Sequence, residues 1–174
     1  MLEPDALALL PCLTSAQQSE RLSLLRDAVG VFTAARAAVY VDIGHSGWLS
    51  VDTAVSRLRA VGADRARGVA RDVSGTRWSD DEVHYARELA TRLPGLHAVV
   101  DTSRDGHGPT AGRAWCNPAG RGFGISPQAV VDAVVDAFVW VKPPGESDAD
   151  SGRDEPTAGS FFPSYAPRLW ARRA

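Results

Sequence analysis

Four short segments of the sequence combine acidic residues with tryptophans and glycines: residues 41–48 (VDIGHSGW), 100–108 (VDTSRDGHG), 115–120 (WCNPAG) and 139–148 (VWVKPPGESD). Sugar rings stack their C–H faces on aromatic rings, and their hydroxyl groups need charged or amide partners. Glycosidic cleavage also needs one carboxylic acid to protonate the leaving oxygen and a second group to activate water. The four segments therefore predict a carbohydrate cleft, in which carboxylates on separate strands could supply both groups.

Alternating strands and helices must position these segments. Apolar residues at helical spacing predict helices over residues 15–36, capped by Thr14 or Ser15, over 51–61 and from Ser79 onward, while apolar runs predict strands over 37–42, 68–73, 96–101 and 136–141. We also predict a helix over 127–135, a loop over 143–159 and a final helix over about 161–172.

This alternation indicates a parallel sheet, and the carboxyl ends of parallel strands lie on one edge of the sheet. Ligands bind at this edge in α/β folds. The residues predicted to lie there are Asp42, Asp72, Asp101 and Lys142. Any one of these acids could instead cap the helix that follows it.

Length and composition limit the possible classes of protein. With 174 residues, a net charge of -2 and 44% hydrophobic residues, the chain fits one soluble domain, yet it is too short for a complete eight-stranded barrel of about 250 residues. No apolar stretch approaches the roughly 20 residues of a membrane helix, and arginines alternate with acids, so we expect neither a membrane nor a nucleic-acid partner. Two cysteines are too few for a zinc site with four cysteine ligands, and His84, His97 and His107 lack metal spacing. We therefore predict no metal.

All four segments, together with Glu3-Pro4-Asp5, resemble signatures of glycoside hydrolase family 6 in the order of the family. This family comprises cellulases, both endoglucanases and cellobiohydrolases, and the resemblance covers about residues 2–171. It implies an α/β fold, a distorted TIM-like (β/α) barrel, here incomplete because the N-terminal strands are missing. Residues 1–174 would then form a single partial catalytic domain.

The implied activity is inverting hydrolysis of β-1,4-glucosidic bonds in cellulose or related β-glucans, without cofactor or metal. Short connections after Asp101 and after Pro127 favour an open, endoglucanase-like cleft. The expected partner is a β-1,4-glucan, and the expected state is a monomer. The family implies secretion, although residues 1–5 carry acids where a signal peptide would be basic.

The resemblance also implies catalytic roles. Asp5 matches the general acid of the family, and Asp148 matches the aspartate proposed as its base, where water is also thought to relay the proton. Asp42 matches a cleft aspartate, and Asp101 and Arg104 match a strand-end pair that supports the cleft through a charged contact.

Further matches imply sugar-binding residues. His45 and Trp48 match residues that hold the sugar on the leaving-group side, and Trp115 matches a tryptophan that stacks a glucosyl unit on the opposite side. Lys142 and Glu146 match residues that bind glucose hydroxyls on the non-reducing side. Trp140 and Trp170 we interpret as core residues.

Several departures put catalysis in doubt. A second family aspartate, thought to raise the pKa of the acid, would precede Glu3, and the chain begins at Met1. Since a nearby like charge raises the pKa of an acid, we expect Asp5 to titrate like an ordinary aspartate. The family partners of Cys12 and Cys116 are also missing, which predicts two free thiols.

Asp72 and Asp105 stand where the family usually has asparagine. A carboxylate at position 72 could alter sugar hydrogen bonding, because it accepts hydrogen bonds but cannot donate them.

Two alternatives stay open. Taken alone, Asp5 would be a solvated terminal residue or a helix cap, and the chain could be a truncated, catalytically dead glucan-binding remnant. A nucleotide-binding α/β domain is disfavoured because no glycine-rich phosphate fingerprint follows a strand.

Overall fold

The fold is an α/β arrangement around one five-stranded sheet. A computed structural model describes residues 1–112, 114–129 and 132–174. Its elements are the short 3-10 helices η1 (Leu10–Cys12) and η2 (Ala63–Arg65), helices α1 (Ser15–Ala34), α2 (Val51–Ala60), α3 (Ser79–Arg92) and α4 (Ala166–Ala171), and strands β1 (Tyr40–Asp42), β2 (Gly68–Arg71), β3 (His97–Asp101), β4 (Gln128–Ala129) and β5 (Val135–Val139). The strand order is β1-β2-β3-β5-β4. The pairs β1–β2, β2–β3 and β3–β5 are parallel and only β4 is antiparallel to its neighbour, so the predicted parallel sheet is confirmed.

Local sequence signals explain where the first helices begin. The Thr14 side chain accepts a hydrogen bond from Gln17 N at 3.4 Å, and the Gln17 side chain accepts one from Thr14 N at 3.0 Å, which forms a capping box before α1. Ser50 caps α2 by accepting from Thr53 N at 3.3 Å. The first turn of α3 carries acids, which suit the positive end of a helix dipole.

The predicted helix over 127–135 is wrong where the structure describes it, because Gln128–Ala129 forms β4 and Val135 begins β5. Residues 130 and 131 of that prediction lie outside the described residues. The Asp132 carboxylate accepts hydrogen bonds from Val134 N at 2.7 Å and Val135 N at 2.6 Å. A side chain that satisfies the backbone in this way favours a turn over a helix.

The final helix is shorter than predicted. Phe162 N donates to Gly145 O at 2.7 Å, and Ser147 N donates to Ser160 O at 2.8 Å, so this part of the chain pairs with the loop after β5. Helix α4 therefore begins only at Ala166. Trp170 is 57% exposed and is not a core residue, and Trp140 is half-buried against Phe123, with ring centroids 5.2 Å apart.

The core lies between the sheet and helices α1 to α3. All four residues of β2 are buried, which explains why its sequence is apolar over several consecutive positions. Gly68 allows β2 to approach β3 closely, because a Cβ atom at this position would lie 2.0 Å from His97 O. A second, smaller cluster of Phe162, Tyr165 and Leu169 packs under the C-terminal segment.

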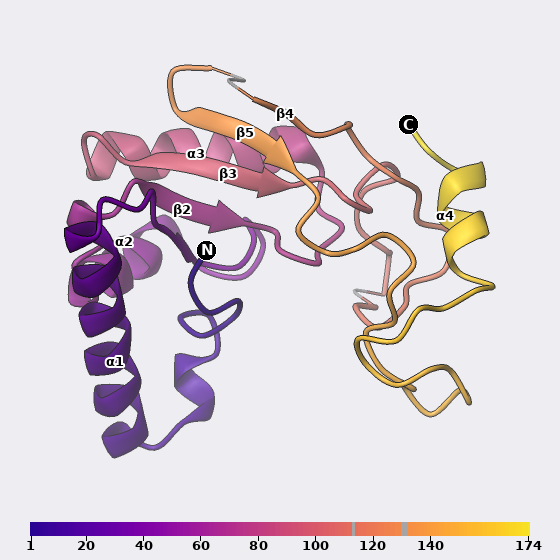
Figure 1. Cartoon of the computed structure of the whole chain (residues 1–174), viewed down its shortest axis with the longest axis horizontal. Coiled ribbons are helices and arrows are strands. Elements are labelled where there is room, and N and C mark those ends of the chain that lie inside the picture. Colours follow the sequence, from indigo (N-terminus) through magenta and orange to yellow (C-terminus); the bar gives the residue numbers. More distant parts are fainter. Residues whose placement is uncertain (113, 130–131) are drawn as a thin grey trace.

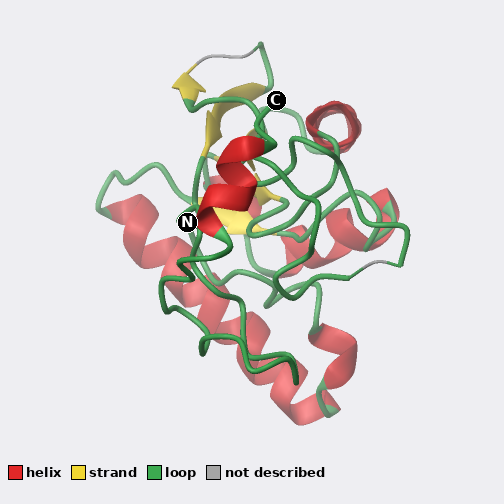
Figure 2. Cartoon of the chain, turned by 90° about the vertical axis from the view of Figure 1, so that its right-hand side faces the viewer, coloured by secondary structure: helices red, strands yellow, loops and turns green. Residues whose placement is uncertain are grey.

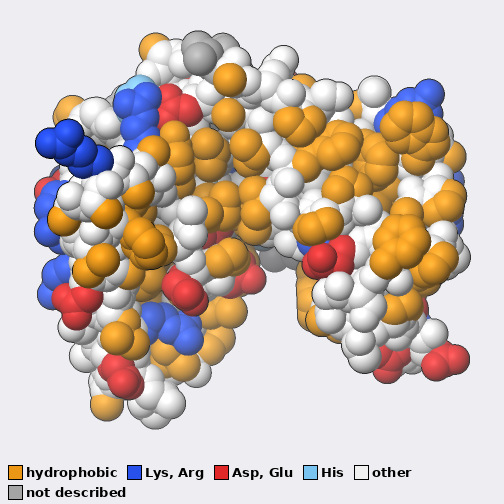
Figure 3. Space-filling model, in the orientation of Figure 1, with side chains coloured by type: hydrophobic (Ala, Val, Ile, Leu, Met, Phe, Trp, Pro, Cys, Tyr) orange, Lys and Arg blue, Asp and Glu red, His pale blue; other side chains and the backbone are white. Residues whose placement is uncertain are grey.

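The strands direct their carboxyl ends toward the loops. The arrows of β2, β3 and β5 point to the half of the molecule made of long loops and α4 (Figure 1). Viewed from that side, loops lie in front of the sheet (Figure 2). The surface is notched between this half and the half that contains α1, and acidic side chains are visible on both sides of the notch (Figure 3).

Candidate active site

Asp42 ends β1 and is buried, with 1% of its surface exposed. One carboxylate oxygen, Oδ1, accepts hydrogen bonds from Asp5 N and Gly44 N, both at 2.9 Å, while Oδ2 has no hydrogen-bond partner among the described residues. Burial raises the pKa of Asp42 to about 6, although the two backbone donors act against this rise. Asp42 is therefore a carboxyl group that holds a proton in mildly acidic solution.

Asp5 lies directly beside Asp42. Leu2 N donates to Tyr40 O at 2.8 Å and Asp42 N donates to Leu2 O at 3.1 Å, so the first residues run alongside β1. The backbone of Asp5 is in the left-handed region, with φ +64°, a conformation that is uncommon for a residue other than glycine. Burial raises the pKa of Asp5. The expectation of an ordinary aspartate is therefore wrong, because half-burial alone disfavours the charge.

Asp148 is in the opposite electrostatic environment. Its side chain is 6% exposed and forms ion pairs with Arg104 Nη1 at 2.6 Å and with Lys142 Nζ at 3.2 Å. It also accepts hydrogen bonds from Ser74 Oγ at 3.2 Å and from Asn117 N at 2.8 Å. Burial works to raise the pKa of Asp148, but the two cations and the hydrogen bonds outweigh it and hold this pKa below its ordinary value. Asp148 is thus an ionised carboxylate.

Asp101 ends β3 and organises the loops around it. Its carboxylate accepts hydrogen bonds at 2.9–3.3 Å from the backbone N–H groups of Ser74, Ser103, Val141 and Lys142. The expected charged contact between Asp101 and Arg104 is wrong, because Arg104 donates to Ser74 O at 3.1 Å and pairs with Asp148. Four backbone donors therefore bind the Asp101 carboxylate.

Lys142 and Glu146 lie in contact, as expected for two groups of one subsite. Lys142 Nζ lies 2.9 Å from Glu146 Oε1 and donates to Ser147 O at 3.2 Å. The Lys142 side chain is 11% exposed, so it is the more enclosed member of the pair. The structure therefore places Lys142, Glu146, Asp148 and Arg104 in one connected cluster.

Trp48 and Trp115, in two of the glycine-containing segments, are exposed. Trp48 is 40% exposed and Trp115 is 70% exposed. The rings of His45 and Trp48 lie 5.3 Å apart with 37° between their planes. Two aromatic surfaces therefore face solvent, one after β1 and one in the loop that reaches the Asp148 cluster.

Sequence reasoning missed Asn117 as a structural link between two loops. Asn117 Oδ1 accepts from Asp148 N at 2.7 Å. Its amide nitrogen donates to Ser147 Oγ at 3.0 Å, to Ala149 O at 2.8 Å and to Glu155 Oε2 at 2.8 Å. Asn117 lies within the WCNP segment, which was the available signal, whereas nothing in the sequence singles out Ser74.

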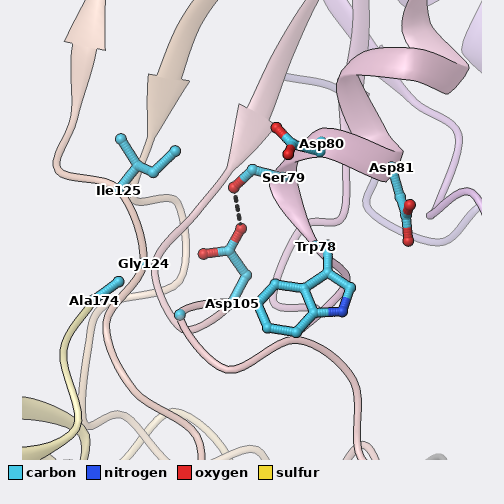
Figure 4. Close-up of a pocket in the computed structure, with 9 residues that line it drawn as sticks. Trp78, Ser79, Asp80, Asp81, Asp105, Gly124, Ile125 and Ala174 are labelled. Carbon is cyan, nitrogen blue, oxygen red and sulfur yellow. Dashed lines mark hydrogen bonds between the residues drawn. The ribbon is translucent and has the colours of Figure 1, made fainter.

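A hollow near the first turn of α3 was not predicted from the sequence. It has a volume of about 380 Å³ and is lined by Trp78, Ser79, Asp80, Asp81, Asp105, Gly106, Gly124, Ile125 and Ala174 (Figure 4). None of the ten predicted site residues lines it. Asp105 accepts from Ser79 Oγ at 2.5 Å, and burial raises the pKa of Asp105 to about 6.

Asp72 is buried between neighbouring acids and does not act alone. It accepts from Arg77 N at 2.8 Å, and burial together with the charges of Glu82 and Asp105 raises its pKa well above the ordinary value.

Other expectations concern thiols, metals and membranes. Cys12 is exposed, Cys116 is buried, and both are free thiols, as predicted. Within the described residues, no group of three or more His, Cys, Asp and Glu side chains is arranged to hold a metal ion. In the same part of the chain, no helix combines the length and the apolar character that crossing a membrane requires.

A parallel sheet with buried carboxylates at its carboxyl edge and exposed tryptophans in the adjoining loops defines an α/β protein with a polar, aromatic-flanked site. The sequence model described as "Glycosyl hydrolases family 6" matches residues 1–173. The chain therefore belongs to glycosyl hydrolases family 6, and the family predicted from the motifs is confirmed.

Individual relatives agree with this assignment. The chain is 42% identical over 167 residues to Endoglucanase A of Cellulomonas fimi, a match that covers 95% of this chain and 36% of that protein. It superposes with a TM-score of 0.93 and 46% identity on the endoglucanase Cel6 of Mycobacterium tuberculosis in complex with methyl-cellobiosyl-4-deoxy-4-thio-β-D-cellobioside, covering 98% of this chain and 59% of that one. Cellobiohydrolase II (Cel6A) of Humicola insolens in complex with glucose and cellotetraose gives a TM-score of 0.81 at 28% identity, covering 98% and 62%.

The chain spans less than two thirds of the length of each of these relatives.

Proposed function

We propose that this chain hydrolyses internal β-1,4-glucosidic bonds of cellulose or related β-glucans with inversion, as part of a larger family 6 catalytic barrel. The observation that carries the proposal is the opposite electrostatic environment of two carboxyl groups. Burial raises the pKa of Asp5, whereas Arg104 and Lys142 overcome burial and lower the pKa of Asp148. Two carboxyl groups whose pKa values are shifted apart are what acid-assisted cleavage of a glycosidic bond requires.

Asp5 is the proposed general acid. A general acid must carry its proton at working pH, and burial raises the pKa of Asp5, which is the direction that this role requires. Its neighbour Asp42, with a pKa of about 6, adds a like charge when it ionises. Ionised Asp42 therefore helps Asp5 to keep its proton as the pH rises toward neutrality.

Asp148 is the proposed partner of the attacking water. Its lowered pKa makes it a weak base, so its main contribution would be to orient the water and stabilise the positive charge that develops on the sugar ring. The proton of the attacking water would then pass through a further water molecule to bulk solvent. Arg104 and Lys142 keep Asp148 ionised throughout this step.

The sugar units would lie along the carboxyl edge of the sheet. His45 and Trp48 are the proposed contacts on the leaving-group side, and Trp115 with Lys142 and Glu146 would hold the other side. Exposed rings suit the apolar faces of glucosyl units, and the Lys142–Glu146 pair suits their hydroxyls. Relatives named endoglucanases, and family structures in complex with a thio-cellobioside or with cellotetraose, support a β-1,4-glucan as the ligand.

The test is hydrolysis of carboxymethyl cellulose by the purified 174-residue chain and by its Asp5→Asn variant. Asp64→Asn is the matched control, because Asp64 is an exposed aspartate in η2. We expect activity in the parent and in the control, and a loss of at least about 100-fold in Asp5→Asn. A parent that binds the glucan in affinity electrophoresis but releases no reducing ends would identify a glucan-binding remnant instead.

A further inference from the structure

Arg71 and Glu82 form an ion pair that is completely enclosed by the protein. Arg71 is the last residue of β2, Glu82 lies in the first turn of α3, and both side chains are 0% exposed with 2.7 Å between Nη2 and Oε2. The guanidinium also lies 4.2 Å from the centre of the Tyr85 ring. Because desolvation largely cancels the attraction in such a pair, apolar residues of similar size often give equal stability. Stability alone therefore does not account for this pair.

The side chains of Arg71, Glu82 and Tyr85 also bind the backbone of residues 43–49. Arg71 Nη1 donates to Ile43 O at 3.4 Å, and Glu82 Oε1 accepts from Ser46 N at 2.8 Å. The Tyr85 hydroxyl donates to Leu49 O at 2.8 Å. The three contacts fall before, within and after the 45–48 turn, which carries His45 and Trp48.

The geometry of the 45–48 turn sets how these two rings lie. Trp48 N donates to His45 O at 2.9 Å, and Gly47 N donates to His45 Nδ1 at 3.2 Å. Ser46, the residue bound by Glu82, stands between the two ring-bearing residues. A displacement of Ser46 therefore changes the position of both rings together.

We propose that Arg71 and Glu82 are positioning residues that hold His45 and Trp48 as one binding surface for a glucosyl unit. This inference rests on the proposed function, which assigns the leaving-group side of the glucan to these two rings. Neither Arg71 nor Glu82 touches the sugar. They act through the backbone of Ile43 and Ser46, and the low dielectric of the interior strengthens these hydrogen bonds.

The experiment replaces the pair by apolar residues of similar size, in Arg71→Met/Glu82→Leu. Relaxation of the Trp48 indole ¹⁵N–¹H group reports the order of the turn, and titration with cellotetraose reports affinity. We expect the order parameter of Trp48 to fall below about 0.6 and the Kd to rise about tenfold, with a thermal midpoint close to that of the parent. The matched control is Arg92→Met/Asp52→Asn, which removes an exposed ion pair of 2.7 Å between α3 and α2 and should leave both readouts unchanged.

A folded double variant with an unchanged Trp48 order parameter and unchanged affinity would overturn the proposal. If the double variant does not fold, Glu82→Gln tests the proposal instead. The amide of glutamine has a single acceptor oxygen, whereas the two carboxylate oxygens of Glu82 accept separately from Ser46 N and Arg71 Nη2. We expect Glu82→Gln to loosen Trp48 and weaken binding about threefold, and no change in either would again overturn the proposal. If the parent does not bind cellotetraose, the proposed function fails, and the Trp48 order parameter still decides the positioning role.

Discussion

The two sides of the candidate site each enclose an aspartate, and the pKa values of these two aspartates shift in opposite directions. Beside β1, Asp42 is buried, its Oδ1 accepts two backbone hydrogen bonds, and its pKa rises to about 6. After β5, Asp148 is similarly enclosed, but Arg104 and Lys142 contact it and its pKa falls. The difference shows that burial alone does not decide the charge of a carboxyl group. The charge depends also on whether a cation is buried next to the carboxyl group.

The largest expected effect comes from removing the cation that makes the two sides different. Arg104→Met leaves Asp148 buried with Lys142 as its remaining ion-pair partner and removes the donor to Ser74 O. We expect the free energy of unfolding at pH 7 to fall by about 3 kcal/mol, because Lys142 alone compensates the buried charge of Asp148 only in part. Urea denaturation measures the change, and the exposed control Arg92→Met should lie within about 0.5 kcal/mol of the parent. A loss as small as that of the control would mean that Asp148 does not depend on Arg104.

Asp42→Asn should raise the free energy of unfolding, in contrast to Arg104→Met. The folded pKa of Asp42 lies above its unfolded value, so its contribution to stability is complete below about pH 4 and is lost as the pH rises through about 6. The amide keeps an oxygen for Asp5 N and Gly44 N and cannot ionise. We therefore expect Asp42→Asn to be up to about 3 kcal/mol more stable than the parent at pH 8 and equal to it at pH 4. Thermal unfolding at both pH values tests this, and a variant that is less stable at pH 8 would contradict it.

Asn117→Ala tests the loop link on the Asp148 side. The substitution leaves Asp148 N and Ser147 Oγ without the amide that now binds them. We expect a loss of about 2 kcal/mol in the free energy of unfolding, because buried polar groups without partners are destabilising. Urea denaturation measures the change, and an unchanged stability would show that the two loops hold together without the Asn117 side chain.

The smallest effects should come from the two exposed tryptophans. A Cβ atom at Gly44 would lie 3.0 Å from the Trp48 ring, so this ring packs on the backbone, whereas Trp115 is 70% exposed. We expect Trp48→Ala to lower the free energy of unfolding by roughly 1 kcal/mol and Trp115→Ala by less than about 0.5 kcal/mol. Both variants should weaken binding of cellotetraose. Equal stability losses would remove this contrast between the two rings.

Much of the fold could be predicted from the sequence because its signals are local. Thr14 and Ser50 precede helices that they cap, and apolar runs ending in Asp42 and Asp101 are strands buried in a parallel sheet. The helix expected over 127–135 failed because Asp132 binds the backbone just ahead of it, which a pattern of apolar residues does not reveal.

The site was predicted less completely because charge depends on partners that are distant in sequence. The strand pattern predicted Asp42, Asp72, Asp101 and Lys142 at one edge of the sheet. The family resemblance, however, paired Arg104 with Asp101 rather than with Asp148. Arg71 and Glu82 are 11 positions apart and carry no motif, so only the folded chain shows that they meet beneath the 45–48 turn.

The central claim is that the two sides of the site hold different protonation states, and a pH titration of the side-chain carboxyl ¹³C signals of Asp42 and Asp148 tests it most directly. The account predicts that Asp42 titrates near pH 6 and that Asp148 titrates below the ordinary range of an aspartate. Titration of both groups together near pH 4, or in the reverse order, would contradict it.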